Sequence, residues 1–250
     1  MVSVRLSHLK KFSCCLALGS ALLASSLPAS ASVGFWQSIQ QKGVLRCGAA
    51  TAAPYVMRDA KSGEYSGYFA ELCRDFGENV LKVKVQFVDA NWDTLVAGLQ
   101  SDKWDMALGL NQTPERALAV AFSAPAQDYQ VSFLINKQNP KMEGVTNKLA
   151  DLDKPGVTFA VMSGTSQDKA VTAAIKKGTI MRLPGNDETR LALMARRADV
   201  LVDASDTNHL LALANPDWAK ENPPGPALAK KGVFFGLLRS ITDTDRDDVN

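Results

Sequence analysis

The sequence alternates short apolar runs with amphipathic segments of helical spacing. In the first half, apolar runs at 44–48, 83–88 and 106–108 are separated by segments at 68–80 and 92–100 whose apolar residues recur at helical spacing. Strands that alternate with helices favour a mostly parallel sheet covered by helices. The sequence therefore predicts an α/β fold for this half.

The same pattern begins again after residue 130. Strands are predicted at 131–135, 158–161, 180–183, 200–202 and 232–236. Helices are predicted between them, at 166–176, 188–196 and 208–214. Each half holds about 100 residues, enough for a small domain of its own. Two such halves predict two lobes, and proteins of this kind bind ligands at strand ends and between domains.

The N-terminus has the pattern of a cleaved secretory signal peptide. Arg5, Lys10 and Lys11 precede an uncharged apolar run at 12–27, and small residues follow at Ala29–Ala31. The run is shorter than the roughly 20 residues that a membrane-spanning helix needs. We therefore expect residues 1–31 to be removed and the protein to be periplasmic.

Composition then excludes several classes of protein. A content of 46% hydrophobic and 22% charged residues is typical of a globular chain and not of a disordered one. Loss of three basic residues with the signal peptide changes the formal net charge from +2 to −1. A chain so close to neutral, without a basic stripe, gives no reason to expect nucleic acid as a partner.

Cysteine and histidine are scarce after residue 31. Only Cys47, Cys73 and His209 remain. An oxidising compartment would permit a Cys47–Cys73 disulfide, and two buried free thiols are an equally open alternative. A single histidine provides no metal-ligand spacing and no catalytic triad beside a nucleophile elbow. No Walker-type loop occurs. We therefore predict no metal, no cofactor and no enzymatic activity.

Three features suit the binding of a small zwitterion. Arg116 lies in the first turn of a helix predicted after Thr113-Pro114, where its guanidinium could pair with a carboxylate. The segment 163–166 forms a second strand-to-helix turn rich in hydroxyl and N–H donors. Asp203 ends a predicted buried strand and could pair with an ammonium group. Taken singly, each feature also fits a structural role as a surface arginine, a helix cap or a turn residue.

The order of these features along the chain resembles a known family. Five motifs carry the resemblance: Gly43-Val44-Leu45-Arg46-Cys47-Gly48, Gly67–Leu72, Trp92-Asp93-Thr94-Leu95 continuing to Asp105, Thr113-Pro114-Glu115-Arg116-Ala117 followed by Phe122–Pro125, and Ser163–Gln167. They are similar to motifs of the family 3 extracellular solute-binding proteins, the periplasmic receptors of polar amino-acid ABC transporters. The resemblance covers about residues 40–240.

The resemblance implies a two-lobed α/β fold, the type II periplasmic-binding-protein fold, with the ligand cleft between the lobes. It implies that the first lobe begins with residues 32–132, that residues 133–228 form the second lobe, and that residues 229–250 return to the first. It also implies a monomer that binds a small zwitterionic ligand and delivers it to the membrane permease of an ABC transporter.

The family's binding residues can be placed on matching positions. For the ligand carboxylate, the resemblance implies Arg116 together with the second-lobe residues Ser163, Thr165 and Ser166. For the ammonium group, it implies the carbonyl of Gly109 and the carboxylate of Asp203. Asn111 would add a polar contact, and Trp92 would lie against the ligand side chain. A buried core position is an equally open alternative for Trp92.

The chain departs from the family pattern at several of these places. Ala52 stands where the family often has an aromatic residue, and Met162 stands where a side-chain-selecting residue is common. The interval from Asp199 to Asp203 is one residue shorter than usual. These departures predict a ligand with a small or apolar side chain, or a ligand that is not an ordinary amino acid.

Two further functions stay open at this stage. A secreted cyclohexadienyl dehydratase resembles these receptors and would use a cleft acid, with Asp203 the candidate, to protonate a leaving hydroxyl. An accessory protein of a periplasmic oxidoreductase could retain the fold without binding a ligand. Turnover of prephenate or arogenate would indicate the enzyme, and the retained Arg116 argues against the accessory protein.

The C-terminal segment matches the family least. The family closes with a return strand and one or two helices, whereas Asp243–Asn250 is acidic and lacks an apolar stripe. Either this member ends early or the chain is truncated. In both cases we expect the missing helix to leave apolar surface of the first lobe uncovered, which predicts either marginal solubility or a partner that covers this surface.

Overall fold

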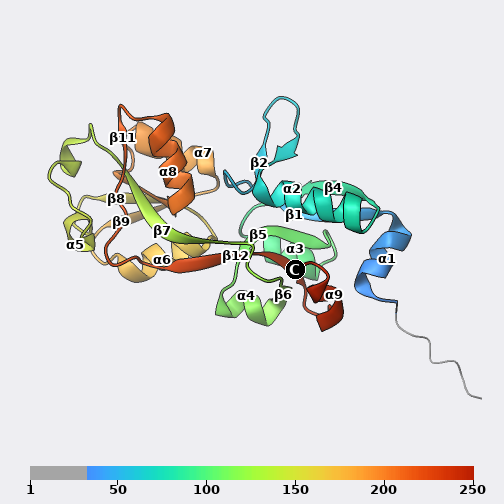
Figure 1. Cartoon of the computed structure of the whole chain (residues 1–250). Helices are drawn as coiled ribbons and strands as arrows, with labels where there is room; N and C mark the ends of the chain where they lie inside the picture. Colours follow the sequence, from blue (N-terminus) through green and yellow to red (C-terminus); the bar gives the residue numbers. More distant parts are fainter. Residues whose placement is uncertain (1–32) are drawn as a thin grey trace, which may run out of the picture. The chain divides into compact units, whose positions relative to one another are not determined.

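The computed structural model describes residues 33–250. The predicted signal peptide at 1–31 lies outside the described residues. Within residues 33–250, no helix has the length and hydrophobicity needed to cross a bilayer. The described residues form two α/β lobes, as predicted, and Figure 1 shows their helices and strands.

The first lobe is built around β1 (Val44–Ala49), which pairs in parallel with β4 (Lys84–Asp89) and β5 (Met106–Asn111). The helices of this lobe are α1 (Phe35–Lys42), α2 (Tyr68–Asp75), the π-helix η1 (Phe76–Val80), α3 (Leu95–Gln100) and α4 (Pro114–Ala119). A short hairpin projects from the lobe and consists of β2 (Met57–Arg58) and β3 (Tyr65–Ser66).

The second lobe contains four strands in the order β7-β10-β8-β9, with β11 (Ala219–Glu221) paired to β7. The four strands span Gln127–Asn136, Val200–Ala204, Thr158–Met162 and Thr179–Leu183, respectively. The helices of this lobe are the 3-10 helix η2 (Pro140–Met142), α5 (Leu149–Leu152), α6 (Ser166–Ala174), α7 (Asn186–Met194) and α8 (Ser205–Ala214).

Two strands connect the sheets of the two lobes. β12 (Lys230–Leu238) pairs antiparallel with β7 at its beginning and with β5 and β6 (Val120–Phe122) further along. Figure 1 shows β7 and β12 running side by side between the lobes. The sheets are therefore mixed rather than mostly parallel. The residue boundaries that we predict for the two lobes stay a prediction.

Strand β5 changes its facing at Gly109. Met106 and Leu108 pack into one apolar cluster and Ala107 into another, as alternation along a strand requires. Leu110 packs with Ala107 instead of with Leu108. The reason is the left-handed backbone of Gly109 (φ 67°), a conformation that glycine adopts readily. The opposing strand β12 shows a register shift at the same level, between Phe234 and Gly236.

Most predicted elements have limits that differ by a few residues from those in the structure, and two of them show the cause. The helix predicted from residue 92 begins only at Leu95, because Asn91 caps a turn in which Thr94 N donates to Asn91 Oδ1 over 3.0 Å. The strand predicted at 131–135 extends over Gln127–Asn136. Its first residues are polar, and they are held in extended form by the pairing with β12.

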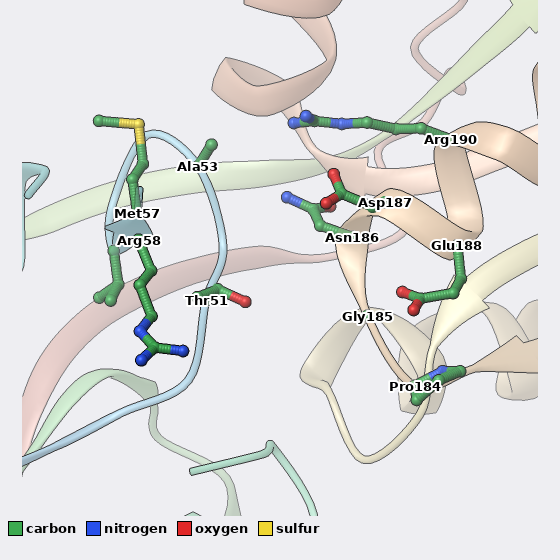
Figure 2. A pocket seen from close by; sticks show the side chains of 11 residues that line it. Thr51, Ala53, Met57, Arg58, Pro184, Gly185, Asn186, Asp187, Glu188 and Arg190 are labelled. Atoms are coloured by element: carbon green, nitrogen blue, oxygen red, sulfur yellow. The ribbon is translucent and has the colours of Figure 1, made fainter. Parts of the chain in front are cut away.

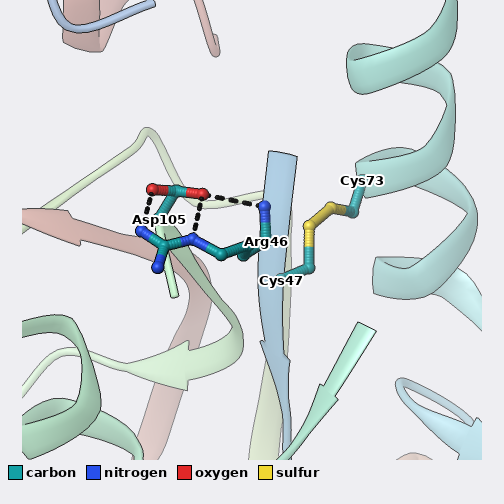
Figure 3. Close-up of a disulfide and its surroundings, with 4 residues drawn as sticks. All are labelled: Arg46, Cys47, Cys73 and Asp105. Carbon is teal, nitrogen blue, oxygen red and sulfur yellow. Dashed lines mark hydrogen bonds and ion pairs between the residues drawn. A yellow bond between two sulfur atoms is a disulfide. The ribbon is translucent and has the colours of Figure 1, made fainter. Parts of the chain in front are cut away.

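A disulfide joins Cys47 on β1 to Cys73 on α2 (Figure 3). Both residues are fully buried. The neighbouring Arg46 pairs with the buried carboxylate of Asp105, with Nη2···Oδ1 at 2.7 Å, and its backbone N–H donates to the same carboxylate over 2.8 Å. The disulfide fastens α2 to β1, and the ion pair holds the turn before β5 against β1.

The C-terminal segment packs on the first lobe through α9 (Asp243–Asp247). Asp245 accepts a hydrogen bond from Phe35 N over 3.1 Å and so caps the start of α1. Ile241 and Val249 pack against the main apolar core, and Asn250 Oδ1 accepts from Ala124 N. Although Asp243–Asn250 lacks an apolar stripe, single apolar residues on either side of the polar helix contact the core.

Reduction of the disulfide should lower the free energy of unfolding by about 3 kcal/mol, since the bond closes a loop with a sequence separation of 26. Urea unfolding with and without dithiothreitol measures this. The double variant Cys47→Ser, Cys73→Ser serves as the control and should not respond to the reductant. Equal midpoints for the oxidised and reduced native protein would show that the bond does not stabilise the fold.

Replacement of Asp245 by alanine should destabilise the protein by about 1 kcal/mol, because the first N–H group of α1 then loses its carboxylate partner. Asp248, an exposed acid of the same segment, provides the matched control. Thermal unfolding of both variants checks the prediction. An Asp248→Ala variant that loses as much stability as Asp245→Ala would indicate an effect of charge alone.

Candidate functional site

A cavity between the two lobes collects several of the predicted residues. It lies where the ends of β5, β8 and β10 meet, and we call it the inner cavity; its lining residues are Ala52, Tyr55, Trp92, Gly109, Asn111, Tyr129, Met162, Thr165, Gln167, Asp203 and Val233. Its free volume is about 20 Å³, roughly enough for one water molecule. A ligand of amino-acid size would therefore require the walls to part or the side chains to rearrange.

Arg116 is a buried cation beside this cavity. Thr113 caps α4 by accepting a hydrogen bond from Arg116 N, and Pro114 occupies the first helical position. The residue is only 8% exposed, and its guanidinium donates to the carbonyls of Asn111 (3.0 Å) and Gly164 (2.9 Å). Within residues 33–250, no acid lies within salt-bridge distance of it. Burial lowers the pKa of Arg116.

A polar cluster connects the lobes next to Arg116. Asn111 Oδ1 accepts from the hydroxyls of Tyr129 (2.8 Å) and Ser166 (2.7 Å), and those two hydroxyls are themselves 2.8 Å apart. Asn111 Nδ2 donates to the carbonyl of Gly232 on β12. Asn111 and Ser166 are thus already bonded within the protein, so a ligand would have to displace part of this network to contact them.

Asp203 lies at the end of β10 and is buried at the inner cavity. Its Oδ1 accepts from Ala204 N over 2.8 Å and, at 3.5 Å, from Gln167 Nε2. Burial raises the pKa of Asp203 to about 6. Burial also raises the pKa of Tyr129. Because no cation of residues 33–250 lies within salt-bridge distance of Asp203, its carboxyl is well suited to receive a positively charged group.

The remaining predicted residues have more varied positions. Thr165 lines the inner cavity, but its hydroxyl donates to Met162 O and accepts from Asp168 N, so it serves as the cap of α6. Trp92 lines the cavity with its indole Nε1 buried and without a hydrogen-bond partner among the described residues. Ser163 is half-buried and does not line the cavity.

Two tyrosines and an acid near the inner cavity are not among the residues predicted from the sequence. Tyr55 and Tyr129 both line the inner cavity, and Tyr55 OH donates to Asp206 Oδ2 over 3.0 Å. Burial raises the pKa of Tyr55 as well. The alternation of polar and apolar residues over 127–131 could have extended the predicted strand to Tyr129. No local pattern indicates that Tyr55, in the loop after β1, faces Asp206 on α8.

Metal binding finds no geometric basis in the described part of the chain. Within residues 33–250, no group of three or more histidine, cysteine, aspartate and glutamate side chains lies close enough together to hold a metal ion. The chemistry that the inner cavity can offer is therefore that of a buried guanidinium, a buried carboxyl, hydroxyls and aromatic rings.

Comparison with known proteins gives three similar relatives. The chain is 26% identical to the cyclohexadienyl dehydratase of Pseudomonas aeruginosa, over 84% of this chain and 78% of that one. It is 26% identical to a putative amino-acid ABC transporter-binding protein, YhdW, of Escherichia coli K12, over 90% and 69%. The crystal structure of the ancestral amino acid-binding protein AncCDT-1, a precursor of cyclohexadienyl dehydratase, matches with a TM-score of 0.73 and 26% identity, over 86% and 97%.

Residues 45–224 match the sequence profile of the bacterial extracellular solute-binding proteins, family 3. The match covers both strand–helix halves of the chain and all eight predicted binding residues. The similar structure has the same two-lobed α/β fold. The chain therefore belongs to the family 3 bacterial extracellular solute-binding proteins.

Proposed function

We propose that this protein binds a small amino acid between its two lobes in the periplasm and delivers it to the permease of an ABC transporter. The observation that carries the proposal is a pair of buried groups of opposite charge, Asp203 in the lining of the inner cavity and Arg116 beside it, and within residues 33–250 neither forms a salt bridge. A buried charge without a counterion is costly, and a zwitterion supplies both counterions at once.

The ligand carboxylate is assigned to Arg116. The guanidinium now donates to two backbone carbonyls, one from each lobe, which are weaker partners than a carboxylate. A charge-assisted pair formed there would contribute about 1.5–3 kcal/mol. The free N–H groups at the start of α6, which Thr165 caps, lie on the second-lobe side of the same place and would add donors.

The ligand ammonium group is assigned to Asp203, with the carbonyl of Gly109 as a second acceptor. Both residues line the inner cavity. Trp92 also lines the inner cavity, and its indole Nε1–H, which has no hydrogen-bond partner among the described residues, would donate to an acceptor atom of the ligand rather than to the ammonium group. Met162 and Val233, also at this wall, favour a small or apolar ligand side chain next to the ammonium group.

The small volume of the inner cavity suggests how the ligand enters. Family members of this fold bind by hinged closure of two lobes, and such closure excludes water from the ligand. Here the cluster of Asn111, Tyr129 and Ser166 would open with the lobes and close again around the ligand. We expect micromolar affinity, equivalent to about −8 kcal/mol.

A saturating amino-acid ligand should raise the melting temperature of the protein by about 5–10 °C when present at 100 times its dissociation constant. Arg116→Ala should weaken binding about 10- to 150-fold and remove about half or more of that shift at the same ligand concentration. Arg197, an exposed arginine, provides the matched control. An Arg116→Ala variant that keeps the full response would exclude Arg116 as the carboxylate partner, and a protein that responds to no ligand would favour the accessory role.

Ligand affinity should fall as the pH drops below about 6, by roughly tenfold per pH unit, because protonation of Asp203 removes the partner of the ammonium group. Isothermal titration from pH 8 to pH 4.5 measures this, and Asp203→Asn should flatten the profile at a lower affinity. The free energy of unfolding without ligand depends on pH in the opposite direction. The raised pKa of Asp203 favours the folded state below pH 4, and that contribution is lost as the pH rises through 6.

A dehydratase is the second candidate function. It is supported by the similarity to cyclohexadienyl dehydratase and by Asp203, a buried carboxyl with a pKa of about 6 that could donate a proton to a leaving hydroxyl. Prephenate or arogenate should then give an aromatic product, at a rate that increases as the pH falls through 6. Binding without turnover, weakening over the same pH range, would favour the receptor.

A further inference from the structure

A second polar pocket lies between the loop at 51–58 and the start of α7 (Figure 2). We call it the outer pocket. Its volume is about 400 Å³, much larger than that of the inner cavity. Asn186, Asp187 and Arg190 line the pocket, and Figure 2 shows all three extending from α7 toward the loop that carries Thr51 and Ala53.

Two polar atoms in this pocket are buried without a partner among the described residues. Asn186 is only 7% exposed, and its Oδ1 accepts no hydrogen bond. Arg190 Nε is likewise buried and donates none. Buried polar atoms are nearly always hydrogen-bonded, so such a pair at one pocket wall indicates that something else satisfies them. The missing partner must offer a donor to Asn186 and an acceptor to Arg190.

The charges around the pocket narrow its chemistry. Arg58 already pairs with Asp89, at 3.4 Å. Glu188 folds back over the backbone at the start of α7, since a Cβ on Gly185 would lie 2.5 Å from Glu188 Oε2. Arg58 is therefore engaged with the protein itself, whereas Glu188 is an exposed acid that lies against the start of its own helix.

Three groups at the start of α7 can meet a ligand in this pocket: the guanidinium of Arg190, the carboxylate of Asp187 and the amide of Asn186. Within residues 33–250, neither Arg190 nor Asp187 forms a salt bridge. A group that carries both an ammonium and a carboxylate would complement them, the carboxylate on Arg190 and the ammonium between Asp187 and Asn186. This is the same chemistry that the proposed function assigns to Asp203 and Arg116.

The two sites are neighbours. The positive charge of Arg190 acts on the carboxyl of Asp203, where it lowers the pKa against the larger effect of burial. Ala52 lines the inner cavity and the adjacent Ala53 lines the outer pocket. One ligand with two polar ends could therefore reach both sites.

We infer that the outer pocket binds the far end of the ligand, and that the ligand is a diamino dicarboxylic acid with an amino-acid group at each end. This inference rests on the proposed function, because the inner end of the ligand is held by Arg116 and Asp203. It replaces the expectation of a small or apolar side chain with a short apolar linker between two zwitterionic ends.

Four probes of similar length test the inference by isothermal titration. 2,6-Diaminoheptanedioic acid has both groups at its far end, 2-aminoheptanedioic acid only the carboxylate, lysine only the ammonium, and norleucine neither. The diamino dicarboxylic acid should bind at least about tenfold more tightly than any of the other three.

Two variants should then separate the far-end contacts. Arg190→Met should weaken binding of the two dicarboxylic acids at least about tenfold and change lysine binding less than about threefold. Asp187→Asn should weaken the diamino acid and lysine but not 2-aminoheptanedioic acid. Arg197→Met, three residues beyond α7 and exposed, is the control for loss of a positive charge.

The outcomes distinguish the inference from the proposed function. Equal affinity for norleucine and the diamino dicarboxylic acid, with both lost in Arg116→Ala, would overturn the outer pocket and leave the inner site intact. Binding that depends on Arg190 but not on Arg116 would instead contradict the proposed inner site. If Arg190→Met and Asp187→Asn weakened the binding of all four probes equally, the outer pocket would not bind the far carboxylate and the far ammonium group of the ligand.

Discussion

The antiparallel pairing of β7 with β12 is the interaction on which the rest of the structure depends. Tyr129 on β7 and Gly232 on β12 both belong to this crossing, and both bind Asn111 on β5. The same two strands continue into different sheets, so any shift in their register would move the first-lobe wall of the inner cavity relative to the second-lobe wall. The site is thus built where the chain passes between lobes.

Near the pairing of β7 with β12, the protein buries the charged groups of Arg116 and Asp203, which a core built only for stability would exclude. Arg116 is held by carbonyls from both lobes, and Asp203 is held by a backbone N–H and a long contact from Gln167. Neither arrangement compensates the loss of hydration as well as an ion pair would. Such uncompensated groups lower stability and are usual at binding sites, where the ligand provides what the protein lacks.

Contacts elsewhere in the first lobe stabilise it and offset the cost of burying these charges. The disulfide between β1 and α2 and the buried Arg46–Asp105 pair lie on the β1 strand, away from the inner cavity lining. Asp245 attaches the start of α1 to the C-terminal helix. These contacts hold the lobe that carries Gly109, Asn111 and Arg116 without drawing on the site itself.

The sequence alone determined the alternation of strands and helices, the two-lobed α/β fold and the family, because these depend on local periodicity and short motifs, and it named Arg116 and Asp203 as candidate binding residues. Gly109 illustrates the limit. Its left-handed backbone turns Leu110 to the other face of β5, and the partner strand that accommodates this is more than 100 residues away. Only the tertiary structure decided that Tyr55 and Tyr129 line the inner cavity, that Ile241 and Val249 pack against the main core, and that Asn186 Oδ1 and Arg190 Nε on α7 have no hydrogen-bond partner among the described residues. Each of these facts concerns contacts between distant segments, and such contacts follow from how strands pair across the lobes, which no local pattern encodes.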